Sequence, residues 1–173
     1  TSASITRQYK FVYEYSKQEW SWNTRKPLYA LQKKSIWYDD CHQLLTHNTL
    51  DKKNKLVTQT EVKMYDSTTE TSTTLSRVDY EYDECGNMTK KREYPDITNS
   101  NDYIETQITY QDNTLPISIS VTGVKDADGN LVNGTGIITE TYVYDDLGRM
   151  IASTDGGGNT KQYTYDKVGR LTS

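Results

Sequence analysis

The most constraining feature of this 173-residue sequence is a short pattern that occurs twice near its end. Residues 142–150 read YVYDDLGRM, and residues 163–171 read YTYDKVGRL. Each matched position in the second copy lies 21 residues after its counterpart in the first. A fixed period of this size is typical of repeat proteins, in which each unit needs its neighbours to bury its apolar face. The sequence therefore predicts a repeat architecture.

Each copy has the pattern of a β-hairpin. Side chains alternate between the two faces of a strand, so the rings of Tyr-x-Tyr share one face, and Tyr and Thr suit a half-buried pleated surface. In the following Asp-x-x-Gly, the carboxylate accepts hydrogen bonds from nearby backbone N–H groups, and Gly supplies the positive φ that closes a short loop. Residues 149–153 then predict a return strand, and residues 155–159 a second turn. One unit therefore contains about two strands.

These residues resemble the YD repeats of the RHS (rearrangement hotspot) family. The family pattern YxYDxxGRLxxxTDxxGNxxxYxYDxxGR agrees almost throughout with residues 142–171, and a further copy begins at Tyr80. Worn copies surround Trp37 and Tyr110. The resemblance implies structural roles in the repeats for Tyr80, Tyr82, Asp83, Gly86, Tyr142, Tyr144, Asp145, Gly148, Arg149, Asp155, Gly158, Asn159, Tyr163, Tyr165, Asp166, Gly169 and Arg170.

The family comprises bacterial Rhs-type toxin shells, toxin-complex C subunits, wall-associated proteins and teneurins. The resemblance implies an all-β fold, in which antiparallel β-hairpin repeats form a curved, spiralling sheet that is a segment of an RHS-type shell. In toxin members this shell encloses a C-terminal effector domain. The implied function is a non-catalytic structural segment of a secreted or surface bacterial protein, with the neighbouring repeats and an enclosed toxin domain as its partners.

The repeats are unequal in quality along the chain. We expect one repeat segment over residues 1–173, with clear repeats at about 78–95 and 138–173 and degenerate repeats at 5–75 and 103–124. The self-cleaving core that closes the shell in complete family members has no counterpart here. Because the sequence stops inside a repeat, we expect an excised segment whose export signal lies upstream.

Composition bears on whether the chain is ordered and on what it binds. Leu, Ile, Val and Phe make up only 31 of 173 residues, a level at which disorder competes with folding. The net charge of only −4 and the 15 tyrosines favour order, in sheets with solvated faces. The acidic balance argues against nucleic acid as a partner, which would need a clustered basic face. No apolar run approaches the roughly 18 residues of a membrane span.

Alternation of apolar and polar residues predicts further strands. Residues 1–15, 28–39, 56–65 and 117–121 fit this pattern, and so does a terminal strand at 161–166. Residues 126–130 predict a turn, and the polar residues 68–74 predict a loop or an exposed hairpin tip. No segment has a sustained helical periodicity, so little or no helix is expected.

The candidate reactive residues favour packing over catalysis. Cys41 and His42 are neighbours, and adjacent side chains of a strand face opposite ways. Cys41 and Cys85 each follow a motif tyrosine by three residues, a position that Leu and Val occupy elsewhere, which indicates packing groups. A disulfide between them remains open, since it depends on direct stacking of two units. With His47 as the only other histidine, no zinc site is predicted.

Two glycine-containing motifs also have simpler interpretations. Residues 126–130 (DADGN) resemble a calcium loop but lack the downstream bidentate Glu, which favours a plain turn. The glycines at 156–158 lack the Lys-Ser/Thr and the helix of a phosphate-binding loop. No pair of carboxylates can be placed across a cleft from the sequence. We therefore predict no enzyme activity, metal or cofactor.

The tryptophans support an alternative function. Trp20, Trp22 and Trp37 could stack on sugar rings from a sheet face, as in a carbohydrate- or cell-surface-binding adhesin module. Packing against a neighbouring layer is the simpler interpretation, because large aromatic side chains mostly serve burial.

Overall fold

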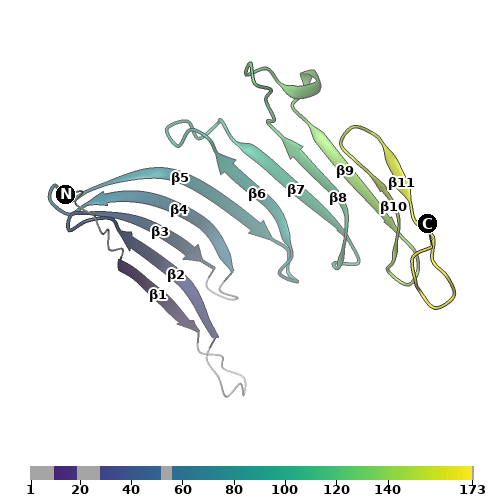
Figure 1. Ribbon diagram of the computed structural model, residues 1–173, viewed down its shortest axis with the longest axis horizontal. Coiled ribbons are helices and arrows are strands. Elements are labelled where there is room, and N and C mark those ends of the chain that lie inside the picture. Colours follow the sequence, from purple (N-terminus) through teal and green to yellow (C-terminus); the bar gives the residue numbers. More distant parts are fainter. Residues whose placement is uncertain (1–9, 19–27, 52–55, 173) are drawn as a thin grey trace, which may run out of the picture. The chain divides into compact units, whose positions relative to one another are not determined.

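The structure of the protein is a computed structural model that describes residues 10–18, 28–51 and 56–172 (Figure 1). In this part of the chain the regular structure is β-strand, apart from one 3₁₀ turn, η1 (Val132–Gly134). The strands are β1 (Lys10–Gln18), β2 (Leu28–Trp37), β3 (His42–Leu50), β4 (Val57–Asp66), β5 (Thr71–Tyr82), β6 (Met88–Tyr94), β7 (Ile104–Gln111), β8 (Leu115–Thr122), β9 (Ile138–Tyr144), β10 (Met150–Thr154) and β11 (Thr160–Gln162).

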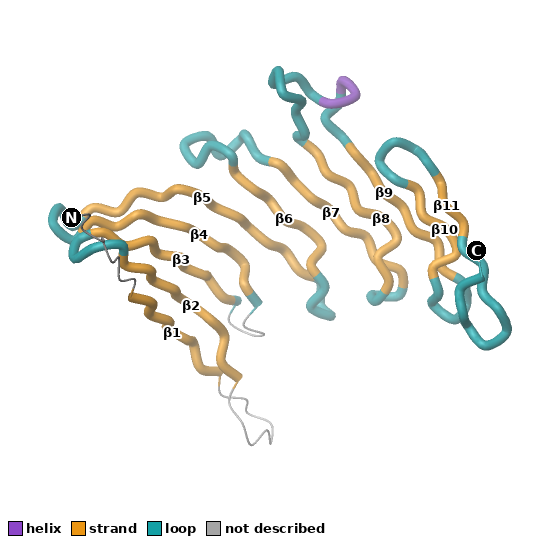
Figure 2. The backbone as a smooth tube through the Cα atoms, in the orientation of Figure 1, coloured by secondary structure: helices purple, strands orange, loops and turns teal. Residues whose placement is uncertain are grey.

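The strand order follows the sequence, from β1 to β11, without a crossover (Figure 2). The paired neighbours are antiparallel, as short hairpin loops require. The predicted all-β class and antiparallel hairpin architecture are therefore confirmed.

The chain divides into two compact units: Thr1–Tyr80 with Tyr94–Ser100, and Glu81–Glu93 with Asn101–Ser173. In the first unit β1 to β5 pair in order, and β3 and β4 remain in register from His42↔Asp66 to Thr49↔Gln59. In the second unit β7 to β10 form two successive hairpins, and β11 pairs with β10 at its outer edge. The second unit contains both clear copies of the 21-residue repeat.

One strand prediction differs from the structure, and one is refined by it. Residues 68–74 form the exposed tip of the β4–β5 hairpin, as one of the two predicted alternatives has it: the turn ends at Glu70, which has a φ of 54°, and β5 begins at Thr71. At the C-terminus the predicted strand 161–166 is interrupted, because β11 ends at Gln162 and Tyr165 forms only an isolated bridge to Leu171. Polar residues thus extend β5. Cross-strand hydrogen bonds determine where a strand begins when its side chains show only weak alternation.

The charged strand β6 (MTKKREY) has no apolar alternation in its sequence. In the structure its basic side chains meet carboxylates on adjacent strands, with Arg92 Nε 2.6 Å from Glu105 Oε2. Glu105 is among the few buried residues, at 9% exposure. Cross-strand pairing of opposite charges therefore stabilises a strand that periodicity does not predict.

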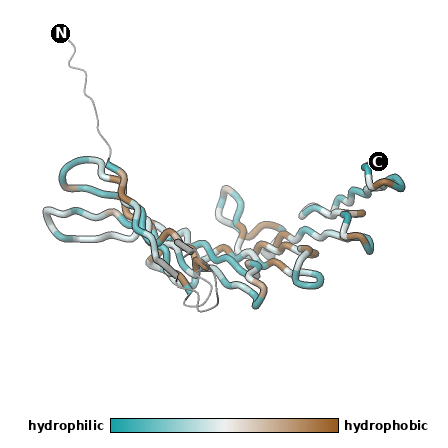
Figure 3. Tube along the Cα trace, turned by 90° about the horizontal axis from the view of Figure 1, so that it is seen from below, coloured by the Kyte–Doolittle hydropathy of each residue, from teal (hydrophilic) through white to brown (hydrophobic). Residues whose placement is uncertain are grey.

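No hydrophobic side chain in the described part of the chain is fully buried. Apolar residues are spread along the strands and do not gather in one core (Figure 3). In the second unit they favour one face: Ile119 lies opposite Ile108, and Val121 lies opposite Ile138. We name this face, with Tyr142 and Tyr144 of β9, the tyrosine face. The opposite face is rich in Ser and Thr, so burial is partial on both sides of a single layer.

Candidate functional site: the repeat turns and their contacts

The motif turn after β9 is closed by the carboxylate of Asp145. Its Oδ1 accepts hydrogen bonds from the backbone N–H of Leu147 at 3.0 Å and of Arg149 at 2.9 Å. Its Oδ2 accepts from Nε of the Arg149 side chain at 2.7 Å. The Arg149 hydrogen bonds lower the pKa of Asp145, because they favour the charged carboxylate. Both carboxylate oxygens thus stabilise the turn.

The same arrangement recurs in other turns of the second unit. Asp166 accepts from the backbone N–H groups of Val168 and Arg170, and Asp83 from those of Cys85 and Asn87, at 2.8–3.0 Å. The turns that begin at Asp126 and Asp155 repeat these backbone contacts. Hydrogen bonds also lower the pKa of Asp83, Asp155 and Asp166. One local structure therefore serves five turns of unequal sequence.

Gly148 occupies a backbone conformation that other residues rarely adopt, with a φ of +75°. Its N–H donates to the carbonyl of Asp145 at 2.9 Å, which closes the turn. The corresponding glycines have the same sign of φ: Gly86, Gly129, Gly158 and Gly169. The glycine of the motif is thus required by backbone geometry.

In three copies, the second tyrosine of the motif reaches back to an earlier hairpin. The hydroxyl of Tyr165 donates to the carbonyl of Met150 at 2.8 Å, and that of Tyr144 donates to the carbonyl of Pro116 at 2.9 Å. In the degenerate copy, the hydroxyl of Tyr110 donates to the carbonyl of Met88 at 3.0 Å. Met88 and Met150 each follow a motif glycine by two residues. The tyrosine of one repeat therefore satisfies a backbone acceptor of the preceding hairpin.

Successive turns also contact one another directly. The guanidinium of Arg149 lies over the ring of Tyr165, 4.9 Å from its centroid. In the earlier copy, where Asn87 replaces the arginine, its side-chain amide donates to the carbonyl of Asn113 at 2.7 Å. We name this series of contacts, between the last motif side chain of one turn and the next hairpin, the turn row.

The position three residues after the motif tyrosine faces solvent in the copies of the second unit, which contradicts the packing role expected for Cys85, whereas Cys41 is partly buried. Leu147 is 77% exposed, Val168 is 75% exposed, and Cys85 is also exposed. In these copies the backbone N–H of the residue binds the motif aspartate on the inner side of the turn, and its side chain lies on the outer side. Cys41 and Cys85 are both free thiols in this structure.

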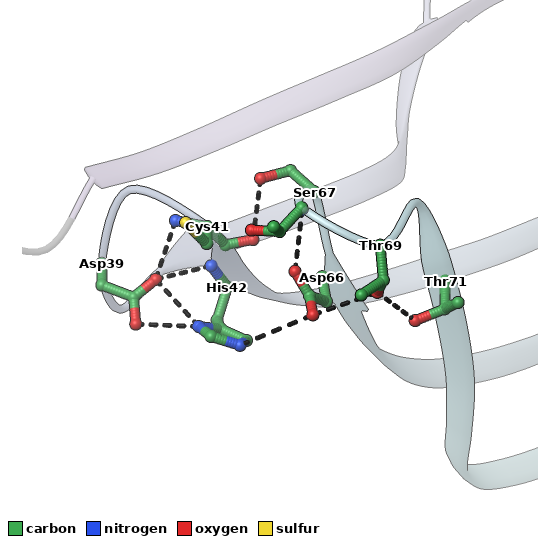
Figure 4. Close-up of polar contacts among 8 residues, drawn as sticks. Asp39, Cys41, His42, Asp66, Ser67, Thr69 and Thr71 are labelled. Atoms are coloured by element: carbon green, nitrogen blue, oxygen red, sulfur yellow. Dashed lines mark hydrogen bonds and ion pairs between the residues drawn. The ribbon is translucent and has the colours of Figure 1, made fainter.

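In the worn turn between β2 and β3, the aspartate binds backbone N–H groups two and three residues later, whereas a motif aspartate binds those two and four residues later (Figure 4). Asp39 Oδ1 accepts from the backbone N–H of Cys41 at 2.8 Å, as Asp83 does from Cys85, but it then accepts from the next residue, His42, at 2.6 Å. The motif glycine is thus deleted rather than replaced, and His42 stands where other copies have Arg or Asn.

His42 keeps the contact of that position with the aspartate of its turn. Its Nδ1 lies 2.9 Å from Oδ2 of Asp39. Its Nε2 lies 3.9 Å from Oδ2 of Asp66, at the end of β4, where the β4–β5 turn begins (Figure 4). The hydrogen bond to Asp39 raises the pKa of His42. The backbone hydrogen bonds from His42 and Cys41 lower the pKa of Asp39 to about 2. Ser67 completes the contact between the turns, since its N–H donates to the carbonyl of Cys41 at 2.8 Å.

A shallow cleft of about 140 Å³ lies on the tyrosine face, between the first tyrosines of the two clear copies. The hydroxyl of Tyr142 donates to Oε2 of Glu140 at 2.7 Å, and the hydroxyl of Tyr163 lies 3.2 Å from Oγ of Ser153. The hydrogen bond to Glu140 raises the pKa of Tyr142 to about 12, so the phenol stays neutral. The remaining lining residues are polar: Thr154, Asp155, Asn159 and Lys161.

The β10–β11 turn forms one wall of this cleft. A side chain on Gly156 would collide with Cγ2 of Ile138 in β9, so the backbone of the turn packs directly on the tyrosine face. Glycine is therefore required at position 156 because the backbone lies so close to Ile138. The sequence of three consecutive glycines does not show which of them is required for this reason.

Of the three candidate tryptophans, Trp37 lies within the described residues. Trp37 lies half-buried at the end of β2, paired with Lys10 of β1 and Gln43 of β3, while Trp20 and Trp22 lie outside the described residues. Tyr80 and Tyr82 occupy the end of β5. Within the described residues, no three His, Cys, Asp or Glu side chains are grouped so as to hold a metal ion. The same residues contain no helix with the length and hydropathy of a membrane span.

Comparison with known protein families is consistent with this geometry. Residues 144–173 match the family described as RHS Repeat. No curated protein matches the chain significantly. The matched residues include both turns that share the arginine–aspartate pair and the tyrosine that joins them. The resemblance seen in the sequence is therefore confirmed over residues 144–173, which match an RHS repeat.

Proposed function

We propose that this chain is a non-catalytic structural segment of a secreted or surface bacterial protein of the RHS type. Its repeats would form part of a β-shell that encloses or presents a toxin or effector domain. The observation that carries the proposal is the hydrogen bond from the tyrosine of one repeat to the backbone of the preceding hairpin, as from Tyr165 to Met150. A unit with such a contact is complete only inside an array.

The burial pattern supports the same function. No hydrophobic side chain is fully buried in the described part of the chain. Neighbouring repeats therefore contribute most of the burial from solvent that a strand has. A wall of edge-paired hairpins has unpaired backbone groups only at its ends, which suits a long continuous barrier.

The chemistry of the turns supports a role without catalysis. The motif carboxylates of Asp83, Asp145 and Asp166 are occupied by backbone and side-chain donors, and these hydrogen bonds lower their pKa values. A general acid would instead need a raised pKa and access to a substrate. These carboxylates hold turns.

The proposal is tested by the dependence of stability on repeat number. The chain is extended after Ser173 by one, two or three copies of residues 153–173, which preserve the 21-residue period. For a repeat array, both the free energy of unfolding and its dependence on urea concentration rise with each copy. A scrambled extension of equal composition is the control. Equal stability of the true and scrambled extensions would contradict the proposal.

The cleft between Tyr142 and Tyr163 favours a second candidate, a carbohydrate- or cell-surface-binding adhesin module. It combines aromatic rings with the hydrogen-bonding side chains of Glu140, Asn159 and Lys161, as sites for polyhydroxylated rings do. Its volume of about 140 Å³ is close to that of a cavity that accommodates one benzene ring, so only part of a sugar ring would lie inside the cleft and the rest would lie above it.

A glycan array separates the two candidates. Saturable binding of the full chain that is lost in Tyr142→Ala and Tyr163→Ala would support the adhesin, and binding lost only in Trp37→Ala would move the site to the first unit. Absence of binding to any glycan leaves the shell segment as the better proposal.

A further inference from the structure

The connection between β8 and β9, residues 123–137, is longer than the corresponding connection in the clear repeat. We call it the β8–β9 lobe. At the same end of the strands, β10 and β11 are joined by residues 155–159 alone (Figure 1). The lobe contains a turn of the same kind, in which the N–H of Asp126 donates to the carbonyl of Asn130 at 2.8 Å. The other residues of the lobe are therefore an addition to the repeat.

The added residues are held in place by backbone hydrogen bonds. The N–H of Val124 donates to the carbonyl of Gly136, and the carbonyl of Val124 accepts from the N–H of Val132, both at 3.0 Å. A Cβ on Gly136 would lie only 2.7 Å from Cδ2 of Leu131, so the Leu131 side chain lies directly over this part of the backbone. The lobe therefore has a defined surface before any partner binds, which lowers the entropic cost of association.

The lobe is also fixed to the segment that leads into β7. Nζ of Lys125 lies 3.2 Å from Oδ1 of Asp102. A side chain on Gly123 would collide with the carbonyl oxygen of Tyr103, so the two backbones pack directly on each other. Both contacts lie within the second unit. The lobe and the residues before β7 thus form one surface.

This surface exposes large apolar side chains. Leu131 and Ile137 are each 46% exposed, and Tyr103 is 36% exposed. Gly136, between Leu131 and Ile137 in the chain, is buried. These residues lie far from both ends of the chain, so the end of the sequence does not account for their exposure. Apolar side chains exposed together on an ordered loop are typical of a protein–protein contact.

The charge of the lobe indicates what kind of partner it fits. Asp126 and Asp128 are exposed at its tip. Lys125 is the only basic residue among residues 123–137, and it is paired with Asp102. The tip is therefore negative, which favours a partner with basic side chains. The same charge disfavours a second copy of this chain, because two tips would bring like charges together, and it disfavours anionic lipid or nucleic acid.

We propose that the β8–β9 lobe is a docking surface for a protein whose apolar pocket is bordered by Lys and Arg side chains. Leu131 and Ile137 enter the pocket, and Asp126 and Asp128 face the basic side chains at its rim. An apolar centre with a charged rim is the usual composition of a specific interface. The inference goes beyond the proposed function, because a segment of a β-wall is complete without the lobe.

The test uses the full chain and a phage-displayed library of short peptides in which a bulky apolar residue is flanked by Lys and Arg. A matched library with Asp and Glu at the flanking positions is the control. We expect saturable binding of the basic peptides alone, weaker at high salt because the carboxylates are exposed. In nuclear magnetic resonance spectra, the amide shifts on binding should be confined to residues 123–137 and to Asp102 and Tyr103.

Two variants locate the contact. Leu131→Ser should weaken binding by more than about fivefold, as loss of an apolar anchor does. Asp128→Lys should weaken binding by about twofold to fivefold. This second variant keeps the lobe folded, because Asp128 contributes its backbone N–H to the turn, at 3.0 Å from Oδ1 of Asp126. Leu147→Ser is the matched control, since Leu147 is an exposed apolar residue in a motif turn at the other end of the strands and should leave binding unchanged.

Three results would overturn the proposal. The first is the absence of saturable binding by any peptide of either library. The second is equal binding of the two libraries, or binding that both lobe variants leave unchanged. The third is self-association of the chain that Leu131→Ser abolishes, which would assign the lobe to a second copy. Each of these results leaves the repeat-array function in place, because that function does not depend on the lobe.

Discussion

The hydroxyl of Tyr165 donates a 2.8 Å hydrogen bond to the backbone carbonyl of Met150, 15 residues earlier. Met150 begins the return strand of one YD repeat, and Tyr165 is the second motif tyrosine of the next. The motif tyrosine therefore has two roles at once: its ring covers the sheet face, and its hydroxyl connects two hairpins. Because no hydrophobic side chain is fully buried among the residues that the structure describes, such contacts between neighbouring hairpins contribute much of the cooperativity.

Removal of this hydroxyl should weaken the connection between repeats. We expect Tyr165→Phe to lower the free energy of unfolding by about 1 kcal/mol, because a part-buried carbonyl loses its donor. Urea unfolding measures the effect. Tyr13→Phe is the matched control, since the 49% exposed side chain of Tyr13 leaves water free to replace any partner of its hydroxyl. An equal effect at both positions would argue against the interhairpin role.

The motif glycine Gly148 should tolerate substitution far less than Gly157, which lies in the triple-glycine turn. Gly148→Val forces a β-branched residue to a φ of +75°, with an expected cost of about 1–3 kcal/mol. Gly157→Ala should cost less, because its new methyl group would meet only side-chain atoms of Asn159 and Asp155, at 3.2 and 3.3 Å. Thermal unfolding compares the two variants. Equal melting temperatures would contradict the requirement for glycine at position 148.

Gly156 provides a test of the packing of the turn on the tyrosine face. We expect Gly156→Ala to destabilise the protein, because the added methyl group collides with Cγ2 of Ile138. Ile138→Ala removes the colliding atom, so the double variant should lose less stability than the sum of the single variants. Additive losses in urea unfolding would show that the turn does not rest on Ile138.

The worn turn around His42 should make stability depend on pH. Asp39 raises the pKa of His42 in the folded state. The resulting stabilisation is fully present below the unfolded pKa of about 6.5 and is lost as the pH rises through the folded pKa. The pKa of Asp39 is lowered, so its contribution is present above its unfolded value of 3.8 and is lost as the pH falls toward 2.

Nuclear magnetic resonance titration of the His42 ring checks this prediction. In Asp39→Asn the midpoint should move to lower pH, because the charged acceptor is gone and only the distant carboxylate of Asp66, at 3.9 Å, remains. Urea unfolding from pH 5 to pH 8 should show a shallower decline for His42→Gln than for the unchanged chain. An unchanged titration in Asp39→Asn would rule out the pairing as the cause.

Local properties of the sequence determined the class of this protein. The 21-residue period, the Tyr-x-Tyr alternation and the absence of helical periodicity depend only on residues near one another in the chain, and they predict antiparallel hairpins. The match of residues 144–173 to an RHS repeat follows from the same local pattern. Backbone sterics and side-chain alternation act within a few residues, which is why these features are readable without a structure.

The contacts between hairpins were decided by the tertiary structure. Tyr144 reaches Pro116, 28 residues away, because a degenerate hairpin without a motif glycine still places its carbonyl there. The collision that excludes a side chain at Gly156 arises from Ile138 on another strand. The outward direction of Leu147 contradicts its apolar character, while its backbone N–H binds the aspartate on the inner side of the turn. Each depends on the register of strand pairing, which arises from many weak cross-strand contacts summed over the whole sheet and not from any single segment.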